Sequence, residues 1–175
     1  MVCLGLLWNG MQDHLKEALT DIATYGEILD CFSINFGDSY ENFVRDIYAQ
    51  DEIAEWKVNK KLETMFACSD SRTITVFMVN IDTKEQEYHP YKKRMVYINL
   101  ERMKREIREK YSHIVPVYFF DNTMHVTDDE KEFKADFGVV KSYIEKGFKP
   151  EPVQFKEEEK PMILSKRIKE DGTEG

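Results

Sequence analysis

Residues Arg72–Ile81 read R-T-I-T-V-F-M-V-N-I, and this stretch decides the fold. It is nearly continuous in apolarity and rich in β-branched side chains, which is typical of a central strand. We therefore expect it in the middle of a sheet. The chain on either side must supply the strands that pair with it and the helices that cover them.

The N-terminal side of this strand predicts two more strands and three helices. An apolar run without alternation predicts a buried strand, alternation predicts a half-buried one, and apolar residues at helical spacing predict a helix. The expected order is strand 2–8, helix 11–25, strand 27–36, and two short helices at about 39–48 and 52–66.

The C-terminal side predicts a polar loop over Asp82–Lys93, then a helix 96–111, a strand 113–120 and a last long helix 127–146. Setting the extra helices aside, the order is βαββαβ. We therefore predict an α+β, ferredoxin-like fold, with an antiparallel sheet and helices on one face. Residues 1–147 form the domain, and residues 148–175 form a charged, largely extended tail in which Met162-Ile163-Leu164 is a candidate docking segment.

The composition of the chain argues against nucleic acids and membranes as its partners. The chain has 175 residues, 42% of them hydrophobic, which is enough to bury a core. Its formal net charge is −8, the wrong sign for a protein that wraps nucleic acid phosphates. No run is long enough to cross a membrane, and the short apolar start at Val2–Trp8 lacks the basic segment of a signal peptide.

Three cysteines, Cys3, Cys31 and Cys68, are widely spaced and odd in number. Because no pair has C-x-x-C spacing, we expect neither a zinc site nor a disulfide framework. They are interpreted as small buried hydrophobes in a reducing compartment, and the expected location is cytoplasmic.

The stretch Phe119–Glu132 is the candidate site. It follows an apolar run and presents Asn122, His125, Thr127 and Asp128 within seven positions, just before a helical pattern. A histidine fixed at a strand end beside free N–H groups of a helix start is suited to phosphate chemistry. The alternative interpretation is a capped turn, with Thr or Asp as N-cap and His125 as an ordinary turn residue.

The pattern Asn122-x-x-His125-x-Thr127-Asp128, together with the element order, resembles the active-site signature N-x-x-H-G-S-D-S of the nucleoside diphosphate kinase family. The similarity covers about residues 4–146. It implies that His125 is the phosphorylated histidine, that Asn122 and Thr127 occupy binding positions, and that Asp136 stands where the family has a Glu that holds the histidine.

Further matches imply binding residues upstream. Ile107-Arg108 corresponds to an I-R pair whose Arg grips phosphate, and Tyr48 corresponds to a Tyr that ends a short helix. The family's catalytic Lys in the first strand is Leu7 here, and its Gly after the histidine is Val126. Its G-x-T-N-P loop is absent. Arg94, in a basic segment, is the candidate replacement as a phosphate ligand.

The resemblance implies a nucleotide-dependent phosphotransferase that acts through phosphorylated His125, with Mg²⁺ arriving on the nucleotide and a homo-oligomeric assembly. The departures at Leu7 and Val126 leave a second hypothesis, a catalytically impaired nucleotide-binding, regulatory or interaction module on the same fold.

Overall fold

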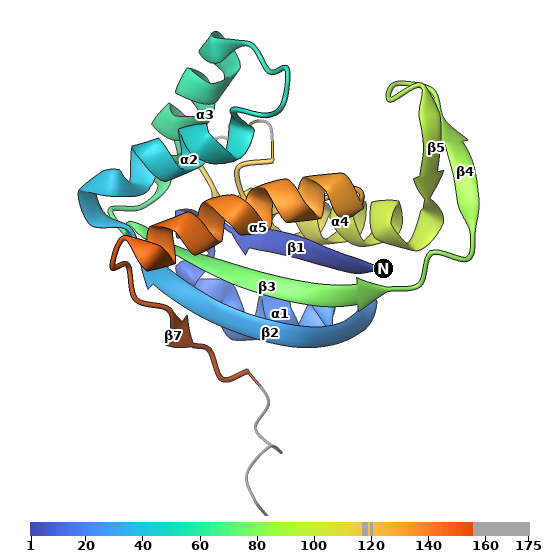
Figure 1. Cartoon of the computed structure of the whole chain (residues 1–175), viewed down its shortest axis with the longest axis horizontal. Helices are drawn as coiled ribbons and strands as arrows, with labels where there is room; N and C mark the ends of the chain where they lie inside the picture. Colours follow the sequence, from blue (N-terminus) through green and yellow to red (C-terminus); the bar gives the residue numbers. More distant parts are fainter. Residues whose placement is uncertain (117–118, 120, 156–175) are drawn as a thin grey trace, which may run out of the picture.

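A computed structural model of the chain describes residues 1–116, 119 and 121–155 (Figure 1). Its strands are β1 Val2–Leu7, β2 Gly26–Asn35, β3 Thr73–Ile81, β4 Gln86–His89, β5 Arg94–Tyr97, β6 Met124–Val126 and β7 Glu151–Pro152. Its α-helices are α1 Leu15–Ile22, α2 Tyr40–Tyr48, α3 Glu55–Cys68, α4 Ile98–Tyr111 and α5 Glu130–Glu145. Short 3-10 helices are η1 Asn9–His14, η2 Gly37–Ser39 and η3 Ser112–Ile114.

The chain is α+β, with a five-stranded antiparallel sheet in the order β6-β1-β3-β2-β7. The prediction that Arg72–Ile81 is central is confirmed, because β3 pairs with β1 on one side and β2 on the other. The order of the first four of these strands is consistent with a ferredoxin-like arrangement. The paired helices α2 and α3, between β2 and β3, also lie where the sequence predicts them.

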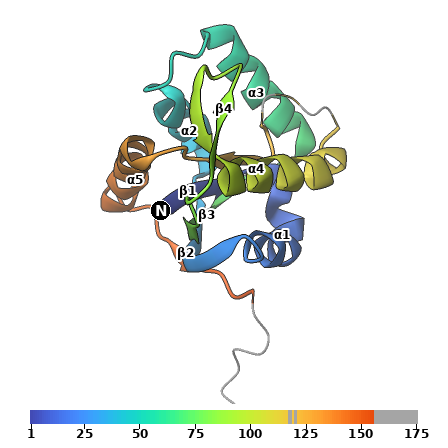
Figure 2. The same cartoon turned by 90° about the vertical axis from the view of Figure 1, so that its right-hand side faces the viewer.

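Helices cover both faces of the sheet, so the prediction of helices on one face is wrong. Helices α1 and α4 cover one face, packing on side chains that include Leu7, Phe77 and Val79. Helices α2, α3 and α5 cover the other, packing on Leu4 and Leu6 among others. Figure 2 shows α5 on one side of the sheet and α1 with α4 on the opposite side. Alternation along β1 supplies one apolar set to each layer.

Two sequence predictions on the C-terminal side are corrected. The predicted strand 113–120 begins within the 3-10 helix η3 and has a bend at residues 115–116, and its residues 117, 118 and 120 lie outside the described residues. The strand that pairs with β1 is β6, which begins only at Met124. The predicted loop 82–93 contains β4, which forms a separate hairpin with β5. Figure 1 shows this hairpin projecting from the sheet beside the start of α4.

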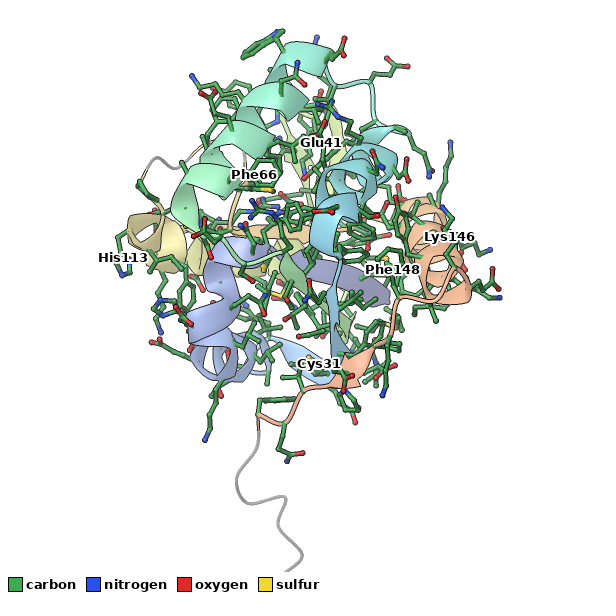
Figure 3. The ribbon with its side chains drawn as sticks, turned by 90° about the vertical axis from the view of Figure 1, so that its left-hand side faces the viewer. Cys31, Glu41, Phe66, His113, Lys146 and Phe148 are labelled. Atoms are coloured by element: carbon green, nitrogen blue, oxygen red, sulfur yellow. The ribbon has the colours of Figure 1, made fainter. Side chains whose placement is uncertain are left out.

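The first part of the predicted tail joins the domain. Phe148 lies beside the end of α5 (Figure 3), with its ring 5.7 Å from that of Phe36 and 5.6 Å from that of Tyr143. Strand β7 then pairs with Phe32 and Ser33 of β2. The segment Met162-Ile163-Leu164 lies outside the described residues. Within the described part of the chain, no helix has the length and apolarity needed to cross a membrane.

Candidate functional site

His125 lies in the middle of β6, where its backbone is paired with Leu6 of β1. Its neighbours Met124 and Val126 are buried in the layer under α1 and α4. Because side chains alternate along a strand, His125 points to the opposite face, the one covered by α2, α3 and α5. The histidine is therefore fixed by a strand, and the turn interpretation of this residue is wrong.

Asp136, on α5, holds one ring nitrogen of His125. The distance from His125 Nε2 to Asp136 Oδ2 is 2.8 Å, and the two side chains are only 13% and 8% exposed. A carboxylate accepts a hydrogen bond, so this contact selects the tautomer in which Nε2 carries the proton. The lone pair then lies on Nδ1. Helix α5 begins just after Asp129, whose carboxylate accepts from the N–H of Glu132 at 2.8 Å.

Tyr48, the last residue of α2, lies at the other ring nitrogen. Its hydroxyl is 3.4 Å from His125 Nδ1, and the two rings meet edge to face at 5.4 Å. Burial raises the pKa of Tyr48 well above its usual value, so its hydroxyl stays protonated and donates. The Trp8 ring lies 6.3 Å from each of the other two rings. Nδ1 is thus directed into an aromatic-walled part of the site.

Arg108 approaches the site from α4. Its Nε donates to the carbonyl of Met124, the residue before His125, at 3.3 Å. The same Nε lies 3.3 Å from Asp121 Oδ1. Asp121 has a φ of 56°, a backbone conformation uncommon for a residue other than glycine. Its carbonyl accepts from the indole N–H of Trp8 at 3.1 Å, which fixes the loop that leads into β6.

Lys61 is a site residue that the sequence analysis did not single out. Its side chain is fully buried on α3, with Nζ 5.4 Å from the ring centre of Trp8 and 5.2 Å from that of Tyr48. Its signal was its spacing, since Val58, Lys61, Leu62 and Met65 form an inward helical stripe interrupted by one lysine.

A cavity of about 230 Å³ opens beside His125. Four carboxylates, of Asp51, Asp129, Glu132 and Asp136, line it together with Lys131. Burial raises the pKa of Asp51, the nearby His125 lowers it, and Asp136 raises it. A polyphosphate approaching from this side meets negative charge, so it must bring a cation with it.

Two predicted ligands are not directed at His125. Arg94 Nη2 lies 2.9 Å from Asp128 Oδ2, and Asp128 also pairs with Lys104 and with Lys92. Arg94 therefore anchors the β4–β5 hairpin to the loop after β6. Thr127 is fully buried, and its hydroxyl accepts from the backbone N–H of Leu4 at 3.0 Å, so it extends the pairing of β1 with the loop after β6.

Asn122 is buried and close to the site but tied to α3. Its side-chain amide donates to Thr64 Oγ1 at 2.9 Å. The structure thus brings His125, Asp136, Tyr48, Arg108 and Asn122 to one region, and separates Arg94 and Thr127 from it. Comparison with protein-family models, curated proteins and solved structures finds no match for the chain.

Proposed function

We propose that this chain is a nucleotide-dependent phosphotransferase that carries the phosphoryl group on His125 Nδ1. One observation supports it above the others: the 2.8 Å contact between His125 Nε2 and the carboxylate of Asp136. It makes Nδ1 the unprotonated nitrogen of the ring, which accepts the 3.4 Å hydrogen bond from Tyr48 and is the nucleophile of a neutral imidazole. The resemblance of Asn122-x-x-His125 to the kinase signature supports the same chemistry.

The proposed reaction has two half-reactions. In the first, the bond between the γ-phosphorus of a nucleoside triphosphate and its bridging oxygen breaks, the diphosphate leaves with the electron pair, and a P–N bond forms to Nδ1. In the second, an oxygen of the acceptor substrate attacks the phosphorus, and the P–N bond breaks with its electron pair returning to Nδ1. Such transfer depends on positioning and on positive charge at the phosphoryl oxygens. Arg108 supplies charge beside β6, and Asp136 stabilises the positive charge that the ring acquires on phosphorylation.

Mg²⁺ fits this site as a companion of the nucleotide. Within the described residues, no group of three or more His, Cys, Asp or Glu side chains is arranged to hold a metal ion. Carboxylates of the cavity, such as Asp51 and Glu132, suit the water-rich coordination of Mg²⁺. When bound, the ion neutralises phosphate charge.

An exposed tryptophan beside a second aromatic ring supports a nucleotide as the donor. Trp56 on α3 is 59% exposed, which is unusual for so large an apolar side chain, and its ring lies 6.5 Å from that of Phe119. Lys57 and Lys60 place ammonium groups 5.8 Å and 5.1 Å from these two rings. Flat aromatic rings beside cations suit a nucleobase and its phosphates.

Trp56→Ala is therefore expected to weaken ATP binding roughly tenfold, because stacking of one base on an aromatic side chain contributes about 1–3 kcal/mol. Calorimetric titration with Mg²⁺–ATP measures the dissociation constant. Tyr88→Ala is the matched control, since Tyr88 is 60% exposed on the distant hairpin. Equal loss of affinity in both variants would contradict a base site at Trp56.

The test of the proposed function is labelling of the intact chain. Incubation with γ-labelled ATP and Mg²⁺ is expected to give a label that is lost in acid and retained in base, as a phosphohistidine is. Peptide mapping should place it at His125. A chain that binds ATP but acquires no such label would contradict catalysis.

The second candidate is a nucleotide-binding or regulatory module that has lost catalysis. The acidic lining of the cavity beside His125 favours it, because four carboxylates oppose the entry of a phosphate chain. It predicts calorimetric binding of ATP or ADP without labelling. We also carry forward the homo-oligomer implied by the resemblance, which light scattering at several protein concentrations tests.

A further inference from the structure

Among the lysines that the structure describes, Lys61 is notable for its complete burial beside the site. Its side chain has no exposed surface, although a lysine is almost never fully buried without a reason. Trp8 and Tyr48, the two rings that lie against its ammonium, are the same two rings that contact His125. The buried cation and the nucleophilic ring therefore share one aromatic enclosure.

The strand register shows why this cation matters. Leu7 and Val126, which stand where the resemblance expects a lysine and a glycine, are both buried in the layer under α1 and α4. They lie on the face of the sheet opposite to His125, so neither can affect a group attached to Nδ1 directly. On the His125 face itself, α3 supplies a buried lysine, Lys61.

We propose that Lys61 is the cation that binds the phosphoryl group carried on His125 Nδ1. This inference rests on the proposed function, and it adds a residue from α3 to the transfer site. Tyr48 lies between the two groups, with its hydroxyl at Nδ1 and its ring against the Lys61 ammonium. A phosphoryl group on Nδ1 displaces the hydrogen bond from Tyr48 and brings its oxygens toward Lys61.

The state of Lys61 before the reaction is consistent with this role. Burial lowers the pKa of the Lys61 ammonium to about 7, with Asp121 raising it and Arg108 lowering it further. Asp121 and Arg108 are the charged groups that act on it, the Tyr48 ring lies against its ammonium, and His125 contacts that same ring. A phosphoryl group on His125 carries negative charge, so its presence favours the protonated, cationic form of Lys61.

The experiment compares the wild-type chain with Lys61→Met, which keeps the length and packing of the side chain but removes the charge. The rate of His125 labelling from Mg²⁺–ATP is measured in a single turnover. We expect this rate to fall by roughly 100-fold or more, which is the loss seen when one preorganised group that stabilises negative charge in the transition state is removed. Lys141→Met, an exposed lysine of α5, is the control and should label at the wild-type rate.

Thermal melting establishes that Lys61→Met is folded; if it is not, Lys61→Gln replaces it, because glutamine keeps polarity in the enclosure. Equal labelling of the folded variant and the wild type would overturn the role of Lys61 and leave the proposed function intact.

A second phosphoryl donor separates the two proposals. Phosphoramidate phosphorylates histidine without a nucleotide, so it tests Lys61 even if ATP labels nothing. Slower phosphorylation and faster loss of the phosphoryl group in Lys61→Met than in the wild type support the proposal. Equal rates overturn it, and a wild-type chain that accepts phosphate from neither donor overturns both proposals.

Discussion

His125→Asn is expected to abolish phosphorylation of the chain by ATP, with a loss of at least about 10³-fold in the labelling rate. The reason is direct, because the variant has no ring nitrogen to form the P–N bond. Asparagine is smaller than histidine and polar, so the fold should survive. Label counted after base treatment, with thermal melting in parallel, checks both statements.

His113→Asn is the matched control, because His113 is an exposed residue of η3 at the outer surface (Figure 3). It should label like the wild type. Asp136→Asn should label more slowly but at the same residue, since the amide holds His125 without favouring one tautomer as strongly. Persistence of the acid-labile label in His125→Asn at the wild-type level would end the proposal of a phosphohistidine at this position.

Gly5→Ala is expected to destabilise the domain by about 3 kcal/mol or more. Gly5 lies in β1 opposite Phe77 of β3, and a Cβ at Gly5 would be 2.0 Å from Cζ of the Phe77 ring. That ring is fully buried, so it cannot move without disturbing its neighbours, and overpacking of a core costs about 1–3 kcal/mol and sometimes more. Urea unfolding followed by circular dichroism measures the change.

A double-mutant cycle tests the cause. Phe77→Leu replaces the ring that meets the new methyl group with a shorter side chain. Gly5→Ala should therefore lower the free energy of unfolding by less in the Phe77→Leu background than in the wild type. Gly138→Ala is the control for the glycine change itself. Its added Cβ meets no atom within 4 Å on the exposed side of α5, and a helical glycine replaced by alanine should gain about 0.5–1 kcal/mol. Strict additivity of the Gly5 and Phe77 changes would contradict the steric explanation.

Local periodicity determined much of this protein. The β-branched run of β3 predicted the central strand, because a strand buried among others needs apolar residues at most positions. The inward stripes of α2, α3 and α4 predicted those helices within a few residues of their observed bounds. The resemblance of Asn122-x-x-His125 to the kinase signature also selected His125 and Asp136, and the structure joins these two side chains by a 2.8 Å contact.

Only the tertiary structure decided which strands pair and which side chains come into contact. The apolar run 113–120 resembles a strand by composition, but the partner for β1 is the short β6, whose pairing depends on long-range contacts. Arg94 carries the charge expected of a phosphate ligand, yet its distance to Asp128 was set by the β4–β5 hairpin. In the sequence, Lys61 resembles a surface lysine of a charged helix. Only the packing of α3 over Trp8 and Tyr48 buries it in the enclosure that also holds His125. Sequence periodicity fixes which face of an element is apolar, whereas the neighbours of each side chain follow from how distant elements pack.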